Sequence, residues 1–236
     1  MDGRATRWAG QHQLRRAQFV DAALAAIARH GPDTSTEQIA TQAGVARTRL
    51  YKHFTDATDL HQSITHKAVE LIARELAPVW NPTGPVMEVI STAVGSYLRW
   101  LGKHRNLYYF LGRHPLTTRG DSIRDIRATI SSYLTRVFEA YLTAFGLDTR
   151  ICEPLAFGII GLVESATSQW LDHPAIISGD ELTQHLTQWI WHMIDNTLQT
   201  RGVQLDPHAP LPPLQIINTP EQPSRVGRDR RGCYGK

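Results

Sequence analysis

Six side chains that can form hydrogen bonds with nucleic acid lie within a single short stretch of the sequence. They are Arg47, Thr48, Arg49, Tyr51, Lys52 and His53. Arginine can bind guanine through two parallel hydrogen bonds, threonine can contact thymine or a hydrogen-bond acceptor, and lysine and histidine can hold phosphate. The group can therefore read the base edges and hold the backbone of DNA. The same residues could also form the solvated face of a short amphipathic helix.

Two short helices separated by a glycine turn are predicted to position these donors. Residues 35–38, Ser-Thr-Glu-Gln, form a capping box that opens a helix over residues 36–43, and a second helix over 46–53 follows the Gly44-Val45 break. Helices of this length, joined this tightly, have the dimensions of a helix-turn-helix, whose second helix enters the major groove of DNA. The agreement of cap, turn and donors favours DNA binding over a solvated face.

Apolar residues on either side of this motif complete a small three-helix core. A helix before it has apolar residues every three or four positions from Phe19 to Ile27 and ends at Gly31-Pro32. Leu50 and Phe54 lie about one turn apart and can anchor the second helix of the motif, which leaves its donors outside. We expect residues 13–58 to form this DNA-binding domain.

The stretch from Ala17 to Leu60 closely resembles the DNA-binding domain of the TetR/AcrR family of bacterial transcriptional regulators. The resemblance rests on residues 39–46, Ile-Ala-Thr-Gln-Ala-Gly-Val-Ala, and 50–54, Leu-Tyr-Lys-His-Phe. It implies a homodimer that binds a roughly palindromic operator, most often as a repressor, and leaves DNA when a small molecule occupies its C-terminal domain. The positions that match base and phosphate contacts in the family are Ser35, Thr36, Arg47, Thr48, Arg49, Tyr51, Lys52 and His53.

One position departs from the pattern of the family. Many members have a lysine that touches phosphate at the start of the fourth helix, where this sequence has Ala57. Residues 1–12 lack periodic apolar positions and look like a loose basic arm. Its arginines, with Arg15 and Arg16, could supply the missing charge by following the DNA backbone or entering the minor groove. The arm could equally be an idle disordered end.

The rest of the chain is predicted to be helical as well. Nearly every patterned segment has helical spacing, and alternating strand patterns are missing. The predicted fold class is therefore all-α, with about nine helices in total. A fourth helix, from Asp56 onward, should leave the small domain, and the proline-rich residues 78–85 should form a connector. Following the resemblance, we expect residues 59–202 to form a larger domain for effector binding and dimerisation.

The last two predicted helices have more apolar surface than one core needs. They cover residues 151–171 and 180–199, and the first of them is apolar on nearly every side. In a homo-oligomer such a surface is usually a two-fold interface, so we expect a homodimer through these two helices. The pattern fits equally well with two helices that fill the core of a monomer.

Aromatic residues in the C-terminal domain indicate where an effector could bind. The resemblance places a pocket among the fifth to eighth helices, and an apolar cavity with a few polar groups is typical of such sites. The candidate ligand-binding residues are Tyr97, Trp100, His104, Tyr108, Phe110, Arg113, Phe138, Phe157 and Glu164. They favour a hydrophobic or aromatic small-molecule effector. Aromatic residues at helical spacing are also ordinary core residues.

Other functions find less support in the sequence. It has no nucleophile elbow, phosphate-binding glycine loop or paired-carboxylate pattern, so we expect neither enzyme activity nor a cofactor. His185 and His192 share a helix without a third ligand, so we expect no metal site, and Cys152 should be inert packing. A helical carrier of lipids or drugs would explain the aromatic C-terminal domain, but it would leave the arginine-rich helix unexplained.

Composition and the end of the chain complete these expectations. Two cysteines, no signal peptide and no bilayer-spanning apolar run favour a cytoplasmic protein without a membrane partner. The net charge of +3 is mild, so DNA binding must depend on where basic residues gather. Residues 203–236 are rich in proline and then in arginine, and we expect a disordered cationic tail. It could add sequence-independent affinity for DNA or be irrelevant to it.

Overall fold

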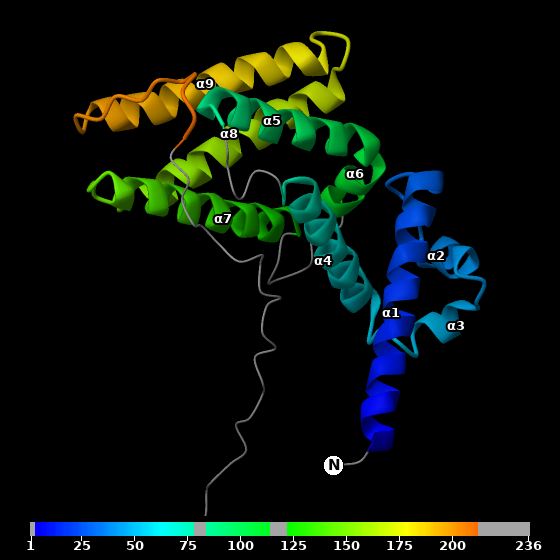
Figure 1. The fold of residues 1–236 in the computed structure, drawn as a ribbon. Coiled ribbons are helices and arrows are strands. Elements are labelled where there is room, and N and C mark those ends of the chain that lie inside the picture. The colour runs from blue at the N-terminus through cyan, green and yellow to red at the C-terminus, as the bar shows by residue number, and fades with distance from the viewer. Residues whose placement is uncertain (1–2, 78–83, 114–121, 212–236) are drawn as a thin grey trace, which may run out of the picture.

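A computed structural model describes residues 3–77, 84–113 and 122–211, which form nine helices (Figure 1). The helices are α1 (Gly3–His30), α2 (Thr36–Gln42), α3 (Arg47–Leu50), α4 (Ala57–Glu75), α5 (Val86–Lys103), α6 (Arg105–Arg113), α7 (Ser122–Ala144), α8 (Cys152–Asp172) and α9 (Gly179–Gln199). Within the described residues, β pairing is limited to one isolated bridge between Pro85 and Pro210. The predicted all-α class is confirmed.

The first three helices and the start of α4 share one small core. Phe19 and Ile27 of α1, Ile39 of α2, Leu50 of α3 and Ile64 of α4 are all buried in it. Each comes from the apolar face that the helical spacing of its segment predicts. Burial of a large apolar side chain contributes about 1.5–3 kcal/mol, so these contacts hold the short helices α2 and α3 in place.

Helix α1 corrects the expectation of a loose arm over residues 1–12. The helix begins at Gly3 and continues without a break to His30. Figure 1 shows its N-terminal end extending beyond α2 and α3. Apolar periodicity could not reveal this part of the helix, because residues 3–12 have no periodic apolar positions in the sequence. Residues 3–12 lack proline, and their two alanines and two arginines have high helix propensity.

Helix α3 is shorter than the predicted span of 46–53. It ends at Leu50, and the next residues form turns closed by hydrogen bonds from Lys52 N to Arg49 O and from His53 N to Leu50 O. Such bonds to the third preceding residue tighten the last turn of a helix. The chain then turns inward, which buries Phe54.

The larger domain consists of α5, α7, α8 and α9. Helix α7 packs mainly on α8, and α5 packs mainly on α9. Their shared core includes Val94 of α5, Ile159 and Val163 of α8, and Leu186 and Ile190 of α9. Figure 1 shows these helices as a bundle on one side of the molecule, with α1, α2 and α3 on the other.

Helices α4 and α6 connect the two domains. Helix α4 begins in the small core, and near its other end Ile72 and Leu76 reach the larger domain. Helix α6 lies against α1, where Asn106 Nδ2 donates a hydrogen bond to Ala28 O at 3.2 Å. The Arg113 guanidinium pairs with Asp33 of the loop between α1 and α2 at 2.7 Å.

Residues 203–211 pass from the end of α9 to the start of α5, and we call this segment the strap. Leu211 N donates a hydrogen bond to Gly84 O at 2.9 Å, and Met87 N donates one to Pro207 O at 3.3 Å. This part of the chain was expected to be disordered. Proline restricts the backbone to extended forms, and the apolar Leu205 and Leu211 pack on the bundle, so the strap is ordered. Residues 212–236 of the expected tail lie outside the described residues.

Candidate nucleic-acid interface and ligand pocket

The turn between α2 and α3 is held by local hydrogen bonds. Ser35 Oγ accepts from Gln38 N at 3.2 Å while Gln38 Oε1 accepts from Ser35 N at 2.8 Å, which is the predicted capping box. Gly44 has φ +68°, a conformation that favours glycine. Val45 N then donates to Ala40 O at 3.0 Å and closes the turn. The Ser35 hydroxyl still carries one O–H donor at the protein surface.

The segment from α3 to Phe54 places most of the predicted DNA contacts on one exposed side. Leu50 and Phe54 are completely buried and fix the segment to the small core, as predicted. Arg47, Thr48, Arg49 and Lys52 are exposed, and Thr36 and Tyr51 are half-buried. The guanidinium of Arg47 lies 5.5 Å from the centre of the Tyr51 ring, so a cation–π contact joins the two side chains.

His53 differs from the other predicted contacts because its ring lies against α1. The ring centroid is 5.2 Å from that of Phe19 and 4.9 Å from that of His12. Its Nδ1 atom is buried without a hydrogen-bond partner among the described residues. Burial lowers the pKa of His53, and the nearby positive charges of His12 and Arg15 lower it further.

Arg16 has a structural role that the sequence did not indicate. Its guanidinium pairs with both carboxylate oxygens of Asp59 at 2.8 and 2.5 Å, and it donates to the backbone oxygen of His53. It also lies 4.3 Å from the centre of the Phe54 ring. The hydrogen bond from Arg16 holds the pKa of Asp59 below its ordinary value. Arg16 therefore joins α1, the turn after α3 and the start of α4.

The start of α4 carries no basic side chain toward the same surface. Asp56 caps the helix by accepting from Asp59 N at 2.8 Å, and Ala57 occupies the first helical position. Any further positive charge near α3 must therefore come from another element. The described side chains of α1 that supply it are those of His12 and Arg15, both exposed.

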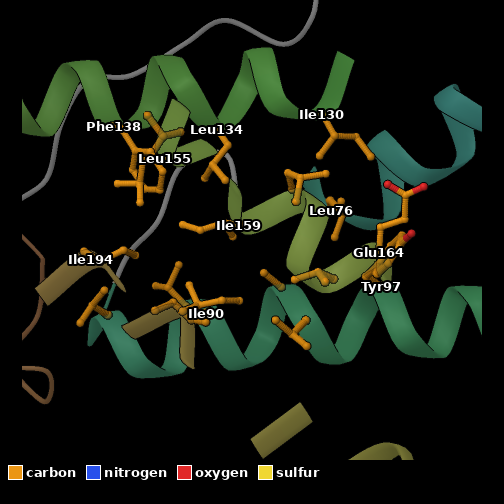
Figure 2. Close-up of a pocket in the computed structure, with 18 of the residues that line it drawn as sticks. Leu76, Ile90, Tyr97, Ile130, Leu134, Phe138, Leu155, Ile159, Glu164 and Ile194 are labelled. Atoms are coloured by element: carbon orange, nitrogen blue, oxygen red, sulfur yellow. The ribbon is translucent and has the colours of Figure 1, made fainter. Parts of the chain in front are cut away.

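The larger domain encloses an apolar cavity of about 220 Å³, lined by α4 to α9 and the strap (Figure 2). Five of the nine predicted ligand residues line it: Tyr97, Trp100, Tyr108, Phe138 and Glu164. Figure 2 shows Phe138, Leu155 and Ile194 at one end and Glu164 and Tyr97 at the other. The cavity is therefore apolar along most of its length and polar at one end.

The other four predicted ligand residues do not line the cavity. Arg113 pairs with Asp33, and Phe110 is buried with its ring stacked on that of His61. The His104 ring lies beside the ring of Trp100, with the centroids 4.8 Å apart. Phe157 lies on the exposed side of α8. Helical spacing alone could not separate these positions from those that face the cavity.

A salt bridge forms the polar end of the cavity. Arg127 Nε donates to Glu164 Oε2 at 2.5 Å, and the Glu164 side chain is mostly buried. Burial and the charge of Glu164 both raise the pKa of Tyr97, so its hydroxyl stays protonated. Sequence reasoning missed Arg127 and also the wall residues Ile72, Leu76, Leu205 and Leu211, because these come from the ends of the domain and meet only in the fold.

None of the helices in the described ranges has the length and apolar character needed to cross a membrane. In the same part of the chain, no three His, Cys, Asp or Glu side chains gather as metal ligands. His185 stacks on Trp189, and the thiol of Cys152 is buried, which raises its pKa.

Comparisons with known proteins agree with this geometry. Residues 19–64 match the family model of bacterial regulatory proteins, tetR family. An uncharacterised HTH-type transcriptional regulator of Mycobacterium tuberculosis is 29% identical over 204 residues, which cover 85% of this chain and 86% of that protein. A tetR-family transcriptional regulator from Streptomyces coelicolor has a similar fold, with a TM-score of 0.64 and 20% identity over 80% of this chain and 83% of that one. The transcriptional regulator FadR from Bacillus subtilis, solved in complex with stearoyl-CoA, gives a TM-score of 0.57 with 20% identity over 74% of this chain and 96% of that one.

Proposed function

The chain carries the DNA-binding domain of the tetR family of bacterial regulatory proteins, and we propose that it represses transcription by binding a roughly palindromic operator as a homodimer. The observation that carries this proposal is the exposed set of donors on and after α3. Arg47, Arg49 and Lys52 point away from a core that Leu50 and Phe54 anchor. A rigid support of this kind lets side chains reach base edges with little loss of entropy on binding.

The proposed dimer forms through α8 and α9. Both helices keep a large apolar side chain on the outside of the bundle, Phe157 with 39% of its surface exposed and Trp189 with 47%. Gly158 and Gly161 lie on α8 near Phe157, where small residues allow a second helix to approach closely. An isologous contact of this face with its copy buries these groups and sets two helix-turn-helix motifs on one side of the dimer.

The proposed effector is a small molecule with a long apolar part. The support is the cavity, whose walls are mostly apolar side chains and which has the Arg127–Glu164 salt bridge at one end (Figure 2). An acyl chain fits this shape, and FadR from Bacillus subtilis, with a similar fold, was solved with stearoyl-CoA. Because Ile72 and Leu76 of α4 line the cavity, an effector that moves them would shift the domain that reads DNA.

A footprint on the DNA upstream of the chain's own gene tests the proposal. The wild type should protect a site with two-fold symmetry, and an Arg47→Ala, Lys52→Ala double variant should lose that protection. The matched control is Arg29→Ala, Lys103→Ala, which removes two positive charges away from α3. Addition of a long-chain acyl-CoA should release the wild type from the site.

Two outcomes would contradict the proposal. Equal loss of protection in the control pair would mean that net charge, not α3, holds the DNA. Absence of any protected site, together with acyl-CoA binding in the cavity, would favour a helical carrier without specific DNA binding.

A further inference from the structure

The N-terminal continuation of α1 lies outside the domain that the family model matches. That match begins at residue 19, whereas the helix begins at Gly3. From residue 10 to residue 15 the side chains are exposed, and Leu14 exposes 64% of its surface. The small core therefore does not require this part of the helix. It nevertheless extends past α3 on the same side of the molecule (Figure 1).

Two turns of this continuation bring side chains of α1 next to His53, near the end of the segment from α3 to Phe54. The rings of His12 and His53 lie 4.9 Å apart, and the ring of Phe19 lies 5.2 Å from that of His53. The positive charges of Arg15 and Arg49 also help to lower the pKa of His53. The contact between His12 and His53 therefore brings α1 beside the segment from α3 to Phe54.

Charge compensation within this cluster is incomplete. The positively charged groups that lower the pKa of His53 are His12, Arg15 and Arg16 from α1 and Arg49 from α3. The acidic group closest to them in the contacts described is Asp59 of α4, and Arg16 engages both of its carboxylate oxygens. Arg15 bonds only to the neutral Gln18 side chain, and neither Arg15 nor Arg49 forms an ion pair within the described ranges. An anion from outside would complete the cluster.

We propose that His12, Arg15, Arg49 and His53 bind one phosphate of the DNA backbone, beside the major groove that α3 reads, and that the two histidines take up a proton as it binds. The inference rests on the proposed function in that it needs α3 against DNA. A phosphate between these groups cancels the repulsion that disfavours a charged histidine pair. DNA affinity therefore rises as pH falls, because the complex holds more protons than the free protein.

A salt series of DNA binding with single variants tests the phosphate contact. Arg15→Gln should weaken binding and reduce the slope of log Kd against log salt by about one per protomer. The matched control is Arg29→Gln, an exposed arginine at the opposite end of the same helix, which should keep the slope of the wild type. A slope for Arg15→Gln equal to that of the control overturns the proposal.

A pH series tests the proton uptake. The affinity of the wild type should rise as pH falls from about 7.5 to about 5.5, the range around the ordinary histidine pKa. His12→Gln should flatten this dependence, whereas His30→Gln, at the far end of α1, should retain it. Since both positions are exposed, neither change removes a core contact, and circular dichroism checks that α1 stays helical. An unchanged pH dependence in His12→Gln contradicts the proton linkage.

The same titrations on a duplex of unrelated sequence separate this proposal from the proposed function. Non-specific binding depends on phosphate contacts, so Arg15→Gln should reduce the slope there too. A reduced slope without any footprint supports the phosphate site and rejects the regulator. A footprint with an unchanged slope supports the regulator and rejects the phosphate site. If inorganic phosphate shifts the histidine resonances as strongly as the duplex does, the cluster is a free-anion site and the assignment to DNA is wrong.

Discussion

Single residues of the DNA-binding surface were predictable where their partners are close in sequence. The anchors Leu50 and Phe54 and the exposed Arg47, Arg49 and Lys52 follow from helical spacing. The roles of Arg16 and His53 could not be predicted in this way. Arg16 bonds to a carboxylate 43 positions later, and His53 turns toward α1 because α3 ends early. Such contacts depend on how helices pack, which local spacing does not encode.

The Arg16–Asp59 pair should stabilise the small domain. Asp59→Asn is expected to lower the free energy of unfolding at pH 7 by about 1–2 kcal/mol, since the pair is partly buried and doubly hydrogen-bonded. The pKa of Asp59 is depressed in the folded state, so this contribution exists above the pKa of the unfolded chain and disappears as pH falls through the folded value. Urea unfolding of wild type and variant measures the difference.

The pH series of that experiment distinguishes the pair from a general effect. The difference between wild type and Asp59→Asn should shrink between about pH 5 and about pH 2. Asp21→Asn, at an exposed position of α1, is the control and should differ little from the wild type at any pH. A difference for Asp59→Asn that persists at low pH would show that the lost charge is not its cause.

The order of the helices and most of their boundaries were predictable from the sequence, and each exception has a physical reason. Apolar spacing detects a helix through its buried face, so the first turns of α1, which have no periodic apolar residues, could not be predicted. The strap was predicted to be part of a disordered tail because the sequence there is rich in proline, although Leu205 and Leu211 are partly buried against the bundle. The α8–α9 pair was recognised as unusually apolar, but the sequence left its dimer role open.

Two glycines of the DNA-binding domain should respond oppositely to the same substitution. Gly44→Ala puts a Cβ on a residue with φ +68° and should cost about 1 kcal/mol of stability, although no atom lies within 4 Å of the new methyl group. Gly10→Ala lies inside α1 with equal space and should instead stabilise the helix by about 0.5–1 kcal/mol. Thermal unfolding compares the two. Equal stability of the wild type and Gly44→Ala would show that the positive φ of Gly44 does not require glycine.

The outer face of α8 and α9 should determine the oligomeric state. Trp189→Asp and Phe157→Asp each place a charge in the proposed interface, and either should convert the dimer to a monomer in sedimentation experiments at micromolar concentration. Ile176→Asp is the control because Ile176 is equally apolar and 78% exposed in the turn between the two helices. A dimer that survives both interface changes would place the contact elsewhere.

For the whole molecule, the sequence indicated two domains but not which contacts connect them. Helix α4 belongs to the core of the small domain at one end and to the cavity wall at the other, and α6 lies against α1. These contacts join residues far apart in the chain. The location of the cavity among α4 to α9 was predicted only in outline, from the resemblance, since its walls exist only after the helices pack.

Two truncations should separate the strap from the residues beyond it. A chain that stops after Gly202 loses Leu205 and Leu211 from the cavity wall, so we expect a lower Tm and much weaker binding of long-chain acyl probes. A chain that stops after Leu211 keeps this wall and should resemble the full protein in both measurements. Equal behaviour of the two truncations would show that the strap does not contribute to the cavity.

The strap also imposes an order on the synthesis of this protein. The helices proposed to read DNA are complete once the ribosome has passed α4, whereas the hydrogen bond between Leu211 and Gly84 must close a loop of more than a hundred positions. A nascent chain is therefore expected to fold α1 to α4 first and to complete the cavity wall last, when the strap packs on the bundle. A nonsense mutation just before the strap should yield a protein that holds its operator and no longer responds to its effector.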